Sequence, residues 1–158
     1  MKTFFISILF LLFTNTSFSQ SKKEVKKHKI KASAVSVVEN GKTINESKTI
    51  FDANGNEIET TDYTKDGSIK AIHKIKYNKE GDEIEDEQYD ASNKLIEKKI
   101  TKYNLSNDKL EENYFDASGK LIKKHLYTYD SKGLKIERKT TDAEGKITSV
   151  KKYVYITK

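Results

Sequence analysis

Between residues 37 and 155, apolar and polar positions alternate along the chain with a period of two residues. In the segment 120–129, Leu121 and Tyr127 fall on one side of an extended chain, and Ile122 and Leu126 fall on the other. These segments are rich in Ile, Val, Tyr and Thr, which favour strands. After residue 31 no ten-residue stretch has helical spacing without a turn motif inside it. The pattern therefore predicts strands.

A short turn motif separates the predicted strands at regular intervals. Each copy has an aromatic or other bulky residue, then usually Asp or Asn, and it closes with Gly or Asn four residues after the first position. The closing residues follow one another in steps of 14 and 12 residues, which gives a 26-residue unit with two unequal halves. Gly and Asn tolerate positive φ, and Asp accepts backbone hydrogen bonds, as hairpin turns require. The closing residues are Gly41, Gly55, Gly67, Gly81, Asn93, Asn107, Gly119, Gly133 and Gly145.

These nine turns predict an all-β fold over residues 32–158. We expect an antiparallel meander of about ten strands, built from 26-residue two-strand repeats. Apolar residues occur on both sides of the strands, and a flat layer would leave one set in water. We therefore expect a twisted single sheet or a curled strip.

The two classes of turn differ in the position of the next apolar residue. It is two residues after Gly before the longer strands (Leu121) and three residues after Gly before the shorter ones (Ile58). Since sides alternate along a strand, either one class has an extra loop residue or bulge, or the shorter strands point their aliphatic residue to the opposite side. We favour the extra residue, because it gathers the aliphatic residues on one side.

The turn motifs resemble the YD repeats of the RHS type. Segments 51–58, 89–96, 115–122 and 129–133 read FDANGNEI, YDASNKLI, FDASGKLI and YDSKG. The resemblance covers roughly residues 37–155 and implies β-hairpin strips, as in large secreted or surface proteins that form shells around toxins or bind carbohydrate. The chain also resembles small exported repeat proteins of Bacteroidetes-type bacteria.

The first nineteen residues have the composition of a signal peptide. A basic start precedes a ten-residue apolar run at 4–13, and Ser17 and Ser19 fit a cleavage site after residue 19. This run is shorter than the roughly 20 residues that a membrane-spanning helix needs. We expect an exported protein, periplasmic or extracellular. Because it contains no Cys, neither disulfides nor thiolate metal sites contribute to the fold.

Most of the net charge of +6 comes from the segment 20–31, which we expect to be a basic flexible tail, and the rest comes from Lys2. Residues 32–158 carry equal numbers of acidic and basic side chains, with acids in excess over 32–90 and bases over 91–158. This distribution is a dipole and not a surface for nucleic acid. The shorter strands are acidic and the longer ones rich in Lys, so rows of opposite charge face each other. Residues 134–141 depart from this rule without a reason in the sequence.

No residue pattern predicts a metal, a cofactor or catalysis. His73 and His125 share one repeat position but lie four strands apart, roughly 19 Å at about 4.8 Å per strand, too far for one ion. No Gly-rich loop leads into a helix, and no Ser, His and carboxylate share a comparable arrangement. We expect a protein that is not an enzyme.

Tyrosines repeat on one side of the predicted strands. Such a column could stack on sugar rings or on side chains of a partner, whereas the interpretation that we favour packs each ring on neighbouring aliphatic residues. Burial of these rings would count against sugar binding. The candidate ligand contacts are Tyr77, Tyr103, Tyr127, Tyr129, Tyr153 and Tyr155.

The sequence favours an exported, non-enzymatic β-repeat protein that acts as a binding or structural module in the periplasm or at the cell surface. The alternative is a carbohydrate-binding module that uses an exposed tyrosine column. The expected partner is a protein or glycan of the cell envelope. The last predicted strand, 146–155, has an open edge that could pair with another copy of the chain, and the tail at 20–31 could contact an anionic membrane surface.

Overall fold

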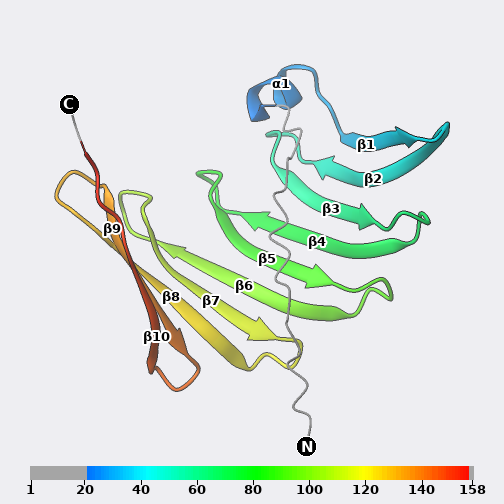
Figure 1. Ribbon diagram of the computed structural model, residues 1–158. Helices are drawn as coiled ribbons and strands as arrows, with labels where there is room; N and C mark the ends of the chain where they lie inside the picture. The colour runs from blue at the N-terminus through cyan, green and yellow to red at the C-terminus, as the bar shows by residue number, and fades with distance from the viewer. Residues whose placement is uncertain (1–20, 157–158) are drawn as a thin grey trace, which may run out of the picture.

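The computed structural model describes residues 21–156 and shows one open sheet of ten antiparallel strands that follow one another in chain order (Figure 1). This confirms the predicted all-β meander. The predicted signal peptide, 1–19, lies outside the described residues. The strands are β1 (Ala32–Glu39), β2 (Lys42–Phe51), β3 (Glu57–Tyr63), β4 (Ile69–Tyr77), β5 (Glu83–Tyr89), β6 (Leu95–Tyr103), β7 (Lys109–Asp116), β8 (Leu121–Tyr129), β9 (Lys135–Asp142) and β10 (Ile147–Lys152).

The sheet is strongly twisted, as expected for a single layer with apolar residues on both sides. In Figure 1, β1 runs across the view while β10 stands nearly upright. Among the described residues only two apolar side chains are buried, those of Val25 and Ala71. Most strand side chains are half-buried by their neighbours in the sheet. Cross-strand pairs on both faces therefore hold the fold together, in place of a central hydrophobic core.

Five-residue loops form all the described hairpins except the first, which turns at Asn40 and Gly41. In the loop 116–120, the Asp116 N–H donates to the Lys120 carbonyl (2.9 Å) and the Gly119 N–H donates to the Asp116 carbonyl (3.0 Å). The Asp116 carboxylate accepts from the N–H groups of Ser118 and Lys120. Gly119 has a φ of +82°. The predicted turn chemistry, Asp first and a left-handed residue fourth, is confirmed.

A one-residue β-bulge follows every five-residue loop, before short and long strands alike. Lys76 pairs with Glu85 and Tyr77 with Glu83, which leaves Ile84 unpaired between them. Our preferred interpretation, an extra residue in one class of turn, was therefore wrong. The first aliphatic residue after a loop has a different position relative to the bulge in the shorter and in the longer strands. The bulge locally breaks the two-residue alternation on which the prediction relied.

The segment expected to be a flexible tail contains a short helix, α1 (Lys22–Lys27), beside the loop between β2 and β3 in Figure 1. Ser21 caps this helix by accepting from the Glu24 N–H. Val25 is 1% exposed, and a Cβ at Gly55 would lie 2.6 Å from the Lys22 carbonyl oxygen. The expectation rested on charge and overlooked Val25, whose burial holds the helix against the sheet.

Candidate functional site

One row of mostly charged side chains crosses the sheet, with one residue on each strand from β4 to β10. The residues are spaced by 13, half of the 26-residue unit. Directly paired residues share a face of a sheet, and the pairs Asp86–Lys99, Glu112–His125 and Arg138–Lys151 place the row on one face. We call this face the front face and these residues the front row. Its members are His73, Asp86, Lys99, Glu112, His125, Arg138 and Lys151.

The first members of the front row form a compensated group. Asp86 lies between two basic side chains, since its carboxylate is 3.4 Å from Nδ1 of His73 and 3.1 Å from Nζ of Lys99. Burial opposes ionisation of Asp86, but the hydrogen bond from His73 and the charge of Lys99 outweigh burial and lower its pKa. The hydrogen bond to Asp86 raises the pKa of His73 in turn. The charges and hydrogen-bonding groups of these three side chains are therefore paired with one another.

Glu112 is the centre of a second compensated group. It is buried, and its carboxylate accepts from the Tyr127 hydroxyl, from Nδ1 of His125 (3.2 Å) and from Nζ of Lys109 (2.6 Å). Burial opposes ionisation of Glu112, yet the hydrogen bonds from Lys109 and Tyr127 hold its pKa at about 2. Burial lowers the pKa of His125. The hydrogen bond to Glu112 acts in the opposite direction, but the charge of Arg138 partly offsets that bond.

Arg138 breaks the alternation of the front row. One repeat earlier its position holds Glu112, and two repeats earlier Asp86. Among residues 21–156 no carboxylate forms an ion pair with Arg138, and its buried Nε has no hydrogen-bond partner there. Its direct partners across the strands are Tyr127 and Lys151. The departure of residues 134–141 from the charge rule thus leaves an uncompensated cation on the front face.

Further cations gather around Arg138. The Lys135 ammonium lies 4.8 Å from the Tyr127 ring centre and 5.7 Å from the Tyr153 ring centre. Lys151 lies 5.4 Å from the Tyr153 ring centre. Such contacts stabilise an ammonium group without neutralising its charge. We call Lys135, Arg138, Lys151, Tyr127 and Tyr153 the basic patch, and it is the candidate functional site.

The predicted tyrosine column is tied into the backbone. Each of its four hydroxyls donates to the carbonyl oxygen of the residue twenty positions earlier, at 2.8–2.9 Å. The first three rings are half-buried, and Tyr155 is 49% exposed. Burial raises the pKa of Tyr77 to about 12. The donor–acceptor pairs are Tyr77–Glu57, Tyr103–Glu83, Tyr129–Lys109 and Tyr155–Lys135.

The six predicted contact residues therefore divide into two sets. Four tyrosines form the column and tie neighbouring strands, whereas Tyr127 and Tyr153 lie in the basic patch. Arg138 was not among the predicted site residues. The 26-residue repeat could have revealed it, because that period aligns Arg138 with Glu112 and Asp86.

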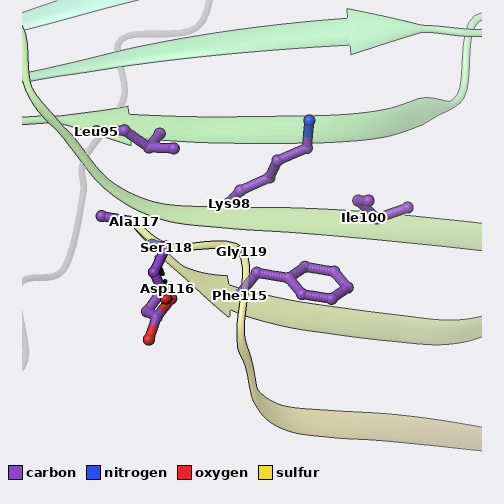
Figure 2. A pocket seen from close by; sticks show the side chains of 8 residues that line it. All are labelled: Leu95, Lys98, Ile100, Phe115, Asp116, Ala117, Ser118 and Gly119. Carbon is purple, nitrogen blue, oxygen red and sulfur yellow. Dashed lines mark hydrogen bonds between the residues drawn. The ribbon is translucent and has the colours of Figure 1, made fainter.

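An open depression on the opposite face holds about 430 Å³ (Figure 2). Leu95, Ile100 and Phe115 line it with the loop 116–119. The one lining cation, Lys98, already contacts Glu85 at 2.7 Å and Glu87 at 3.2 Å. The depression is an apolar recess with a neutralised rim.

A second hollow, of about 590 Å³, lies between α1 and the loops 52–56 and 78–82. Lys22, Lys23 and Lys26 line it together with asparagines of the two loops. No three His, Asp or Glu side chains in the described part of the chain could hold a metal ion. No helix within residues 21–156 is long and apolar enough to cross a membrane.

Comparisons with known proteins give no family. No family model matches the chain, and no curated protein does. A crystal structure of a protein of unknown function from Bacteroides fragilis NCTC 9343 is 12% identical over 80% of this chain and 96% of its own, with a TM-score of 0.46. A mutant of TarM from S. aureus, in complex with fondaparinux, α-GlcNAc-glycerol and UDP, is 19% identical over 84% of this chain, with a TM-score of 0.29. This chain spans only 25% of that protein.

Proposed function

We propose that this chain is an exported, non-enzymatic β-repeat module that binds a partner of the cell envelope through the basic patch. The observation that carries this proposal is the uncompensated charge of Arg138. An acid at this position would continue the alternating row, as Asp86 and Glu112 do earlier. The chain instead carries a cation beside Lys151 and close to Lys135.

An anionic group on the partner fits this surface. A guanidinium presents a planar fork of donors that matches a carboxylate, phosphate or sulfate in a bidentate manner. No carboxylate among the described residues pairs with Arg138, and the two lysines add positive potential that attracts anions. The surrounding tyrosines hold the lysines near the arginine by cation–π contacts.

The protonation states on the front face support a binding role over a catalytic one. A general acid or base works best with a pKa near the working pH. The pKa of Glu112 is about 2 and that of Asp86 is lowered as well, so both carboxylates remain ionised and paired. Their hydrogen bonds organise the sheet.

Carbohydrate binding by the tyrosine column is the second candidate. The observation that favours it is the exposed ring of Tyr155, which lies next to the patch through its hydrogen bond to the Lys135 carbonyl. Half-burial of Tyr77, Tyr103 and Tyr129 counts against a continuous stacking platform. A glycan array probed with the wild type and with Tyr155→Ala separates this candidate from the first.

Retention on an envelope fraction tests the proposed function. Residues 20–158 and the double variant R138Q/K151Q are passed over envelope material from the source cells. A matched control, K42Q/K48Q, removes two exposed charges on β2 at the other end of the sheet. We expect at least about tenfold weaker retention for R138Q/K151Q, because truncating charged contacts costs binding free energy, and no more than about twofold for the control. Equal loss in both variants contradicts a specific patch, and recovery of the full-length chain in the cytosol contradicts export.

A further inference from the structure

The open edge of β10 differs from every other long strand in what lies beside it. The long strands β4 and β6 are each followed in the sheet by an acidic short strand, β5 or β7. Lys76 of β4 contacts Glu85 of β5 at 2.5 Å, and Lys102 of β6 contacts Glu111 of β7 at 3.1 Å. Within the described residues no strand follows β10, and all of its side chains are exposed.

Two neighbouring positions of β10 are basic in the same places as on β4. Lys151 corresponds to His73, and Lys152 corresponds to Lys74, each 78 residues later, which is three repeat units. On β4 these positions face β5, where Lys74 pairs directly with Glu87 and His73 contacts Asp86. A strand with the sequence of β5, placed beside β10 in the same register, would set a glutamate opposite Lys152 and an aspartate beside Lys151.

The backbone of β10 is available for such pairing. The Tyr153 N–H donates to the Ile136 carbonyl of β9 at 3.0 Å, so this residue turns its backbone groups inward. Because successive residues of a strand turn their N–H groups to opposite sides, Lys152 turns its N–H to the open edge. Exposed edge strands accept a further strand through such groups.

We infer that β10 accepts an extended acidic segment of a partner protein as an eleventh strand, paired antiparallel, with its acids on Lys151, Lys152 and Arg138. This inference rests on the proposed function and names the chemistry of the partner. A second copy of the chain fits less well. Its free edge is β1, with the sequence ASAVSVVE, whose one acid, Glu39, is at the end of the strand. Pairing with β1 would leave the cations of β10 without acids opposite them.

A synthetic peptide with the sequence of residues 82–90, DEIEDEQYD, is the probe for this inference. The protein is residues 20–158, labelled with ¹⁵N, and the control peptide has every Glu and Asp replaced by Gln and Asn. We expect amide shift changes concentrated in β9 and β10, at least about tenfold weaker binding of the neutral peptide, and weakening by salt.

Variants of the protein separate charge from backbone pairing. K151E/K152E should weaken binding of the acidic peptide at least about tenfold, whereas K42E/K48E, a charge-matched reversal on β2, should leave it within about twofold. Lys152→Pro removes the outward N–H and should abolish binding while its circular dichroism spectrum stays that of a sheet. Chemical shifts that do not centre on β10, or equal binding of both peptides, would overturn the inference.

Two further results decide between this inference and its rivals. Sedimentation without peptide should show a monomer, and a salt-sensitive oligomer that K151E/K152E dissolves would assign the edge to a second copy instead. If the acidic peptide fails to bind while envelope retention still depends on Arg138 and Lys151, strand addition is wrong and the proposed function stands. If both fail, the basic patch has no binding role.

Discussion

The hydroxyl of Tyr103 donates a 2.9 Å hydrogen bond to the carbonyl oxygen of Glu83, twenty residues earlier in the chain. The same bond recurs in every repeat from Tyr77 to Tyr155. It joins the end of each long strand to the start of the short strand before it. The tyrosine column is thus a structural feature of the sheet, placed by the repeat itself.

Loss of one such bond should have a small and repeatable cost. We expect Tyr103→Phe and Tyr129→Phe each to lower the free energy of unfolding by about 1 kcal/mol, and the double variant to lower it by about twice as much. Urea unfolding followed by circular dichroism measures these values. Tyr153→Phe is the matched control, because Tyr153 meets its neighbours through its ring face; a cost as large as that of Tyr103→Phe would contradict this account.

The pKa values of the two histidines of the front row should lie on opposite sides of the ordinary histidine value of 6.5. The hydrogen bond to Asp86 raises the pKa of His73, whereas burial lowers that of His125, assisted by the charge of Arg138. Protonation of His73 therefore stabilises the fold at acidic pH, and this contribution is lost as the pH rises through its folded pKa. Protonation of His125 destabilises the fold as the pH falls through its own. Two-dimensional NMR of the imidazole protons measures both, and Arg138→Gln should raise the pKa of His125 alone.

Glu112→Gln should destabilise the protein by about 1–3 kcal/mol at pH 7, because Lys109, His125 and Tyr127 lose a charged acceptor. The pKa of Glu112 is depressed from 4.5 to about 2. Its contribution is therefore complete above about pH 4.5 and is lost as the pH falls toward 2. Unfolding free energies of the wild type and the variant should converge over this window. A difference that does not depend on pH would show that the carboxylate charge plays no part.

Gly55→Ala should cost more than Gly133→Ala. Both glycines have positive φ, +82° and +76°, so both substitutions strain the backbone by about 1 kcal/mol. Only at Gly55 does the new Cβ meet the helix, 2.6 Å from the Lys22 carbonyl oxygen. We expect rapid trypsin cleavage within α1 of Gly55→Ala and slow cleavage in Gly133→Ala. Equal cleavage would show that α1 does not depend on this contact.

The meander could be predicted from the sequence because its signals are local. An Asp at the first loop position and a Gly or Asn at the fourth specify each reversal without reference to distant residues. The bulges could not be predicted, since Ile84 and Leu95 look equivalent in a period-two pattern. Only the strand pairing shows that Ile84 is left unpaired and that Leu95 is paired. Helix α1 depends on one buried residue, Val25, in a segment dominated by lysines.

The candidate site needed the register of the sheet. The shared position of His73 and His125 was visible in the sequence, but their acidic partners lie on other strands at the half-unit spacing. Once these strands are paired, Arg138 and Lys151 stand out as the members of the row with no acid beside them. Charge counts along the chain could show an excess of cations in residues 91–158 but not which cation lacks a partner.

Arg138→Glu tests the central claim most directly, because it restores the alternation of the front row. The new carboxylate would stand beside Lys151 and near Lys135, so we expect unfolding free energy to rise by about 0.5–1 kcal/mol, while retention on the envelope fraction falls at least about tenfold. Both quantities are measured on the same preparation. A variant that is less stable than the wild type, or one that binds the envelope as well as the wild type does, would contradict the account.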